Sequence, residues 1–172
     1  MLDHPTRQRI LAFIRDHPAT SGRAVQRGVG LGWGDTLYQI GLLTREGAIV
    51  RIRGGRRDFL FVAGSEVADR PVLTAMQSRI ERAILVTVAR RGPLTFGEIV
   101  GATRERKSSV AFHLRVLLAG TLLVPETDGS LRRYRVRAPG LVLKLYDAFK
   151  DSFEETWSET FATIWGGLTT QS

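Results

Sequence analysis

The chain carries one pattern twice, and this internal repeat constrains the fold more than any single residue does. Arg9-Ile10-Leu11, at the end of one helical stretch, reappears as Arg82-Ala83-Ile84-Leu85 about 74 positions later. In each repeat a short helical segment follows, at 22–27 and 96–101, and then a second helix, at 36–46 and 108–119, which ends at a glycine. Two apolar segments joined by a tight turn complete each repeat, at 49–53 and 58–62 and at 122–125 and 131–136.

The order of helix, helix, helix and hairpin predicts a winged helix, which is a helix-turn-helix with a β-hairpin appended. We therefore expect a mainly α protein with small β-hairpins (α+β), formed by two winged helix-turn-helix domains in tandem and a long C-terminal helix. The expected domains are residues 1–64 and 73–138, with a linker at 65–72 and the C-terminal helix at 139–172. Domains of this size lie near the lower limit for independent folding, so we expect the two to support each other.

Positive charge is concentrated in the repeats. Residues 1–140 hold 23 lysines and arginines against 12 carboxylates, a net charge of +11, whereas residues 141–172 hold 2 against 5, a net charge of −3. A domain pair with this excess attracts a polyanion, and we expect the partner to be double-stranded DNA.

The composition argues against several other classes of function. Cysteine is absent, which excludes disulfides and thiolate metal ligands. The histidines have no carboxylate or second histidine at ligand spacing, and no serine lies in a nucleophile elbow, so we expect no enzyme, no metal and no cofactor. No apolar run reaches the length of a membrane span, and the first residues have no signal-peptide core, so we expect a cytoplasmic protein without a membrane partner.

The second repeat has the sharper DNA-binding pattern. Thr95 followed by Glu98 predicts a capping box at the start of the first short helix. The next helix is expected to bury an apolar stripe of Val110, Leu114, Leu117 and Leu118. Its opposite face and the preceding turn would meet a DNA major groove, and the returning hairpin strand would contact phosphates. The candidate DNA-contacting residues are Arg104, Arg106, Lys107, Ser108, Ser109, Phe112, His113, Arg115, Arg132 and Arg133.

The segment from Lys107 to Gly120 resembles the recognition helix of ArsR-like winged-helix repressors, in which a serine-rich start is followed by His-Leu, a basic residue, a leucine and Ala-Gly. The resemblance covers residues 82–136 and implies that Ser109, His113 and Arg115 face DNA. The cysteine-bearing metal site of that family is missing here, so a metal-sensing role is not implied. The alternative for His113 is a helix-surface histidine packed against the hairpin.

The first repeat is similar but altered. Glycines alternate through residues 28–34, Asp35 is placed to cap a helix from Thr36, and this helix is expected to bury Leu37, Ile40 and Leu43. The Gly-Trp-Gly sequence followed by Thr-Leu-Tyr-Gln-Ile resembles the first domain of archaeal two-repeat winged-helix regulators. The candidate DNA contacts are Thr36, Tyr38 and Gln39 on the helix and Arg51, Arg53, Arg56 and Arg57 on the hairpin. For these arginines the alternatives are a grip on phosphates and a solvated hairpin.

The C-terminal segment predicts a long helix with an apolar stripe and an acidic polar face. We expect this stripe to form a homodimer, which would match palindromic half-sites in DNA. Packing within the chain is the first alternative, and binding to a membrane surface is the second. The candidate dimerisation residues are Leu145, Phe149, Phe153, Trp157, Phe161 and Ile164.

These patterns together predict a sequence-specific transcriptional regulator, with base contacts from the second repeat and phosphate contacts from the arginine-rich hairpins. A tandem winged-helix protein-interaction scaffold and a non-specific architectural DNA-binding protein are the alternatives. A further alternative is a switch that responds to an unknown small-molecule effector between the C-terminal helix and the repeats.

Overall fold

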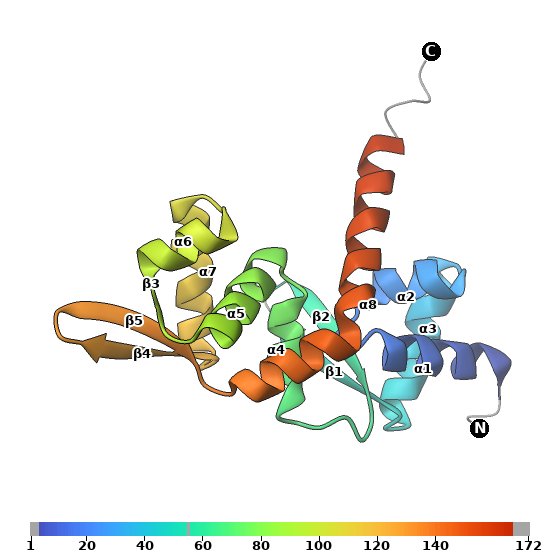
Figure 1. Ribbon diagram of the computed structural model, residues 1–172. Coiled ribbons are helices and arrows are strands. Elements are labelled where there is room, and N and C mark those ends of the chain that lie inside the picture. The colour runs from blue at the N-terminus through green and yellow to red at the C-terminus, as the bar shows by residue number, and fades with distance from the viewer. Residues whose placement is uncertain (1–3, 55, 167–172) are drawn as a thin grey trace, which may run out of the picture. The chain divides into compact units, whose positions relative to one another are not determined.

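The computed structural model describes residues 4–54 and 56–166, with side-chain surroundings as far as Phe153. The fold is mainly helical and contains two small antiparallel sheets (Figure 1). The chain divides into two compact units, Met1–Ser65 together with Phe149–Ser172, and Glu66–Ala148. Within the described ranges, no helix combines the length and the apolar character that a bilayer span requires.

Three helices followed by a hairpin form most of the first unit. Ser21 caps the second helix, because its hydroxyl accepts a hydrogen bond from the backbone N–H of Ala24 at 3.2 Å. The hairpin is antiparallel and in register from Ile49 opposite Val62 to Gly54 opposite Arg57. The elements are α1 (Pro5–Asp16), α2 (Gly22–Val29), α3 (Trp33–Arg45), β1 (Ile49–Gly54) and β2 (Arg57–Val62).

The core of the first unit collects apolar side chains from all of these elements. Ile10, which belongs to the repeated Arg-Ile-Leu pattern, is completely buried, and so is its counterpart Ile84 in the second unit. The repeated pattern therefore marks a fully buried anchor residue in α1 of the first unit and in the helix Arg79–Arg91 of the second. The remaining buried members of this cluster are Ile14, Val25, Val29, Ile40, Leu43, Ile49 and Leu60.

The second unit repeats the same order of elements. Four of its elements begin and end 74 residues after their counterparts, as the starts of α3 at Trp33 and α7 at Lys107 illustrate. The unit comprises α4 (Asp69–Met76), α5 (Arg79–Arg91), β3 (Leu94–Thr95), α6 (Phe96–Thr103), α7 (Lys107–Ala119), β4 (Leu123–Asp128), β5 (Leu131–Val136) and the first part of α8 (Pro139–Gly166).

The correspondence extends to single hydrogen-bonding positions. Thr95 caps α6 as Ser21 caps α2. A two-residue strand, β3, pairs with β5 and gives a sheet of order β3-β5-β4, with Leu94 opposite Tyr134. In the first unit a single bridge joins Thr20 to Leu60 at the equivalent place. The sequence did not predict β3, which is too short for an alternating pattern to be detected.

Two helix boundaries differ from the sequence-based prediction. Helical signals in the sequence run from Leu73 to Arg90 and predict one helix there, but α4 ends at Met76 and α5 starts at Arg79. Ser78 adopts an extended backbone between them, and its hydroxyl accepts a hydrogen bond from the N–H of Glu81 at 3.4 Å. In addition, α4 begins inside the segment expected to be a linker.

The start of α3 also corrects the prediction. The helix begins at Trp33 rather than Thr36, and Gly32 is its N-cap without any side-chain hydrogen bond, so Asp35 is not the cap. Thr36 lies on the same face as Ile40 and Leu43 and is fully buried. Its hydroxyl is satisfied there, because it donates to the carbonyl of Gly32 at 2.8 Å. Leu37, expected in the core, is 42% exposed.

Candidate nucleic-acid interface

The turn between α6 and α7 presents backbone and side chains suited to an anion. Arg104 ends α6 in the left-handed conformation, with φ of 57°. Arg106 is the N-cap of α7 and makes no side-chain capping bond, so neither Ser108 nor Ser109 starts the helix as predicted. The first N–H groups of a helix have no intrahelical partner, and without a side-chain cap they remain available to an acceptor such as phosphate.

The two faces of α7 differ as the sequence predicts. Val110, Leu114 and Leu117 are buried, as predicted for the core-facing stripe, whereas its fourth predicted member, Leu118, is only half-buried. The opposite face carries Ser108, Phe112, Arg115 and Val116, all of which are exposed. Phe112 and Val116 are 55% and 41% exposed, respectively, so an apolar pair lies beside the arginine on this face.

Cations around the start of α7 are not neutralised by neighbouring carboxylates. Arg104, Arg106, Lys107 and Arg115 are exposed, and none has a carboxylate partner within the described part of the chain. The acid that lies among them, Glu105, is held by Arg79 of α5 at 2.5 Å. This arrangement leaves a strong positive potential over the turn and the first part of α7.

His113 lies on a different face from the one expected. Its Nδ1 atom is 2.9 Å from Oε1 of Glu81 in α5, and the two side chains are 21% and 13% exposed. His113 therefore fastens α7 to α5 instead of belonging to the exposed face, and Ser109 is half-buried. No local pattern predicts this pair, because its members are 32 residues apart.

The first unit has a bond at the equivalent place. Nε of Arg7 in α1 donates to Oε1 of Gln39 in α3 at 3.2 Å, again over 32 residues. Arg7 and Gln39 precede Glu81 and His113 by 74 positions. We call these two contacts the braces. Gln39 is thus occupied and half-buried, which corrects its assignment as a DNA contact; Thr36 is excluded because it is buried.

The outward face of α3 is more apolar than that of α7. Tyr38 is 61% exposed and occupies the position of Phe112 in the second unit. Its neighbour Leu37 is also exposed, and Gly41 stands where α7 has Arg115. Each unit therefore presents an aromatic side chain at the same site, with Arg115 close to it on α7, whereas the exposed arginine of α3, Arg45, lies in the last turn of that helix.

Two arginines of the second hairpin have different surroundings. Arg132 is exposed, lies 5.6 Å from the ring centre of Tyr134 and has no carboxylate partner in the described ranges. Arg133 is engaged: Nη1 donates to the carbonyl of Pro93 at 3.3 Å and lies 3.5 Å from Oε2 of Glu98. Of the two predicted phosphate contacts, Arg132 remains available.

Glu98 completes the predicted capping box, which the structure confirms. Its carboxylate accepts from the backbone N–H of Thr95 at 2.7 Å, while the Thr95 hydroxyl accepts from the N–H of Glu98 at 3.3 Å. The Thr95 hydroxyl also donates to the Glu98 carboxylate at 3.0 Å. The bonds that this carboxylate accepts, first from the Thr95 backbone and then from the Thr95 hydroxyl, lower the pKa of the Glu98 carboxyl, and the positive charges of Arg133 and Arg91 act in the same direction.

The first hairpin divides its four arginines in the same way. Arg51 pairs with Asp58 at 2.7 Å, and Arg53 lies 3.9 Å from the same carboxylate. Arg56 and Arg57 are exposed and have no carboxylate partner within the described ranges. A polyanion would therefore meet Arg56 and Arg57 first, because Arg51 and Arg53 are already partly compensated.

Several residues of the expected dimerisation stripe pack within the single chain. Leu145 and Phe153 are only 4% and 3% exposed, and Phe149 is half-buried. These side chains are consistent with the alternative of intrachain packing. The surroundings of Trp157, Phe161 and Ile164 lie outside the described side chains.

Comparisons with known proteins do not identify the chain. No protein-family model and no curated protein matches it. Hypothetical protein PyrSV_gp04 from Pyrobaculum spherical virus is a similar structure at 18% identity and a TM-score of 0.39, covering 78% of this chain and 96% of that one. DIP2311 protein from Corynebacterium diphtheriae is similar at 16% identity and a TM-score of 0.30, covering 74% of this chain and 26% of that one. A functional assignment therefore depends on the chain's own residues.

Proposed function

We propose that this chain is a sequence-specific, double-stranded DNA-binding transcriptional regulator built from two winged helix-turn-helix units. One observation carries the proposal. Exposed cations without carboxylate partners in the described ranges surround the start of α7. The solvent-exposed face of this helix carries both polar and aromatic side chains. Such a combination suits a helix in the major groove, where basic residues hold phosphates and side chains of the first turns meet base edges.

The proposed roles follow from exposure and chemistry. Arg115 is the candidate for bidentate contact with a guanine edge, and Ser108 is a second hydrogen-bonding group on the same face. Phe112 is placed to contact a thymine methyl group. Arg104, Arg106 and Lys107 hold phosphates from the turn, and Arg132 does so from the hairpin tip.

The first unit has a supporting role in this proposal. The first two turns of its helix α3 expose Leu37 and Tyr38, and the exposed arginine of this helix, Arg45, lies in its last turn, so base contacts there are few. Arg56 and Arg57 act as an additional phosphate grip. Dimerisation remains part of the proposal, and it depends on the segment from Trp157 onward, since Leu145 and Phe153 are buried within the chain.

The test is selection of bound duplexes from a random pool, followed by binding of variants to the enriched sequence. Arg115→Ala should relax preference at one base pair by about 1–3 kcal/mol, whereas Arg132→Ala should weaken all duplexes alike. Two-fold symmetry of the enriched motif would support a dimer. Equal losses from both variants on every sequence would contradict specific base contact by α7.

A protein-interaction scaffold is the second candidate, because Phe112 and Val116 form an exposed apolar pair on α7. Apolar and aromatic side chains are enriched at the centres of protein interfaces, and the surrounding arginines would then form the rim. Absence of duplex binding at low salt would favour this candidate over the first.

A further inference from the structure

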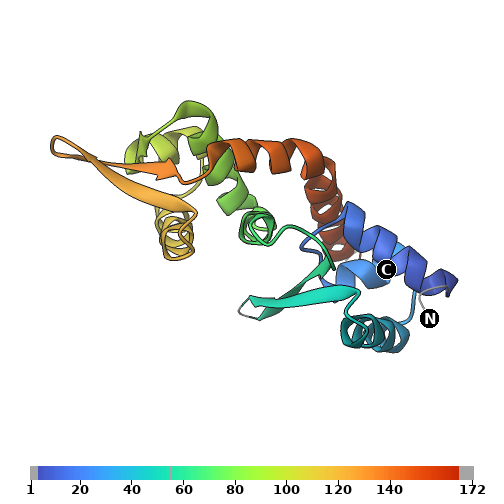
Figure 2. The ribbon, with the colours of Figure 1, turned by 90° about the horizontal axis from the view of Figure 1, so that it is seen from below.

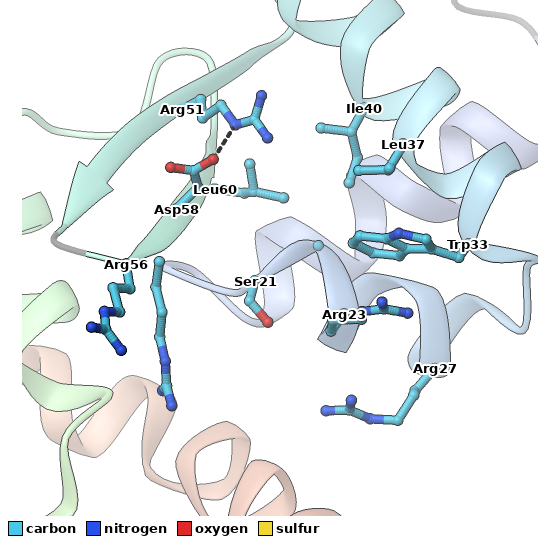
Figure 3. Close-up of a pocket in the computed structure, with 12 residues that line it drawn as sticks. Ser21, Arg23, Arg27, Trp33, Leu37, Ile40, Arg51, Arg56, Asp58 and Leu60 are labelled. Carbon is cyan, nitrogen blue, oxygen red and sulfur yellow. Dashed lines mark ion pairs between the residues drawn. The ribbon is translucent and has the colours of Figure 1, made fainter.

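A pocket of about 490 Å³ opens in the first unit, between the start of α2, the start of α3 and the hairpin β1–β2 (Figure 3). This volume is within the range of small-molecule sites. Its wall is apolar where Trp33, Leu37, Ile40 and Leu60 line it. The unexpected exposure of Leu37 is explained by this position, because the side chain faces the pocket instead of the core.

The lining of the pocket is strongly cationic. Five arginines and one carboxylate contribute to it, and the carboxylate, Asp58, is paired with Arg51 at 2.7 Å. Arginines from the hairpin and from α2 lie on opposite sides of the opening in Figure 3. Gly22, the first residue of α2, also lines the pocket, so the positive end of a helix adds to the field. The arginines are Arg23, Arg27, Arg51, Arg56 and Arg57.

These arginines are not needed to build the fold. The second unit forms the same elements 74 residues later, and it has neither arginine nor lysine at any of the five equivalent positions. Trp33 and Leu37 are likewise replaced, by Lys107 and Ala111. The pocket chemistry is therefore a property of the first unit alone. The equivalent residues are Gly97, Gly101, Pro125, Ser130 and Leu131.

We propose that this pocket binds a phosphate ester of mononucleotide size. Guanidinium groups pair with phosphate through two parallel hydrogen bonds, and Arg56 and Arg57 have no carboxylate partner in the described ranges. The base lies against the apolar wall formed by Leu37 and Leu60. Since the same hairpin arginines are proposed to hold DNA phosphates, a bound nucleotide displaces DNA from the first unit. This regulatory step rests on the proposed function, whereas nucleotide binding does not.

Isothermal titration calorimetry of the full chain with AMP, GMP, CMP and UMP tests whether the pocket binds a mononucleotide. Adenosine and inorganic phosphate, the two parts of AMP, are titrated separately for comparison. We expect at least one mononucleotide to bind on the order of tenfold more tightly than either half. Arg57→Ala should weaken it about tenfold, since a charge-assisted bond is lost. Leu37→Ala should weaken the mononucleotide but leave inorganic phosphate unchanged. Arg15→Ala, an exposed arginine of the same unit outside the pocket, is the matched control.

The absence of mononucleotide binding, or equal losses in Arg57→Ala and Arg15→Ala, would overturn the proposal. The same variants are then titrated with duplex DNA in the presence and absence of the bound mononucleotide. A mononucleotide that raises the DNA Kd of the wild type, but not of Arg57→Ala, supports the regulatory step. Duplex binding that depends on Arg57 without any mononucleotide binding would show that the pocket takes DNA phosphate only, against the proposal. Mononucleotide binding without duplex binding would support the pocket and refute the proposed regulator.

Discussion

If the second unit binds DNA as proposed, the number of its phosphate contacts should determine how steeply its affinity falls as the salt concentration rises. Four exposed cations of the second unit are proposed to hold phosphates and lack carboxylate partners in the described ranges: Arg104, Arg106, Lys107 and Arg132. Each phosphate contact contributes roughly −0.9 to the slope of log K against log salt. Four contacts give a slope of about −3.6, which corresponds to a loss of about 150-fold in affinity between 50 and 200 mM salt.

Lys107→Ala is the informative perturbation, because Lys107 is exposed at the first position of α7 and has no carboxylate partner among the described residues. The slope should become shallower, at about −2.7, which corresponds to a loss of about 40-fold over the same salt range. Lys144→Ala is the matched control. Lys144 is an exposed cation on α8, and in Figure 2 α7 lies at the lower edge of the second unit and the start of α8 at its upper edge.

Fluorescence anisotropy of a labelled duplex, titrated at five or more salt concentrations, measures both slopes. A two-fold dimer on a palindromic site would double each of them. The reasoning fails if Lys107→Ala and Lys144→Ala change the slope equally. It also fails if the wild-type slope is close to zero, because counterion release would then contribute nothing.

Three further predictions concern single residues. Replacing a contacted thymine by uracil should weaken wild-type DNA binding about fourfold, the effect of one buried methyl group. The same replacement should leave DNA binding by Phe112→Ala unchanged. An equal loss of binding in that variant would exclude contact between Phe112 and the thymine methyl group. In Gly41→Ala the added Cβ has no neighbouring atom within 4 Å in α3, so the variant should raise the unfolding free energy by up to about 1 kcal/mol. In Gly28→Ala the added Cβ lies 2.1 Å from the Phe13 side chain, so the variant should lower the unfolding free energy by about 1–3 kcal/mol. Chemical denaturation measures both. Because the pKa of Glu98 is lowered in the folded state, its carboxylate stabilises the fold at pH values above its unfolded-state pKa, and this contribution disappears as pH falls through the lower folded-state pKa. Glu98→Gln keeps the capping geometry, so the deficit of this variant in unfolding free energy should shrink on acidification. A pH-independent deficit would contradict this prediction.

Local patterns in the sequence were sufficient for most elements of the fold. The capping box of Thr95 and Glu98 and the hairpin turn at Gly129 depend on residues close in the chain, and both are present. The buried stripe of α7 follows from helical spacing alone. The mainly helical class with two small antiparallel sheets is likewise confirmed.

Errors arose where partners are distant or where a polar residue is satisfied locally. His113 and Gln39 each bind a residue 32 positions away, which no local pattern reports. Thr36 is a polar residue by type, but its hydroxyl bonds to the carbonyl of Gly32 in the preceding turn, which allows the side chain to be buried. The repeat itself held the missing signal: 74 positions after Thr36 stands Val110, a fully buried core residue.

The braces also limit how the two units could exchange their DNA-facing helices. Each brace has its own chemistry, a guanidinium with a carboxamide in the first unit and a carboxylate with an imidazole in the second. A chimera that grafts α7 into the place of α3 would set His113 against Arg7, and the guanidinium would lose the carboxamide oxygen of Gln39 to which it donates. Transplanting the partner from α5 together with α7 restores the match. The DNA specificity proposed for α7 should therefore be transferable only together with α5.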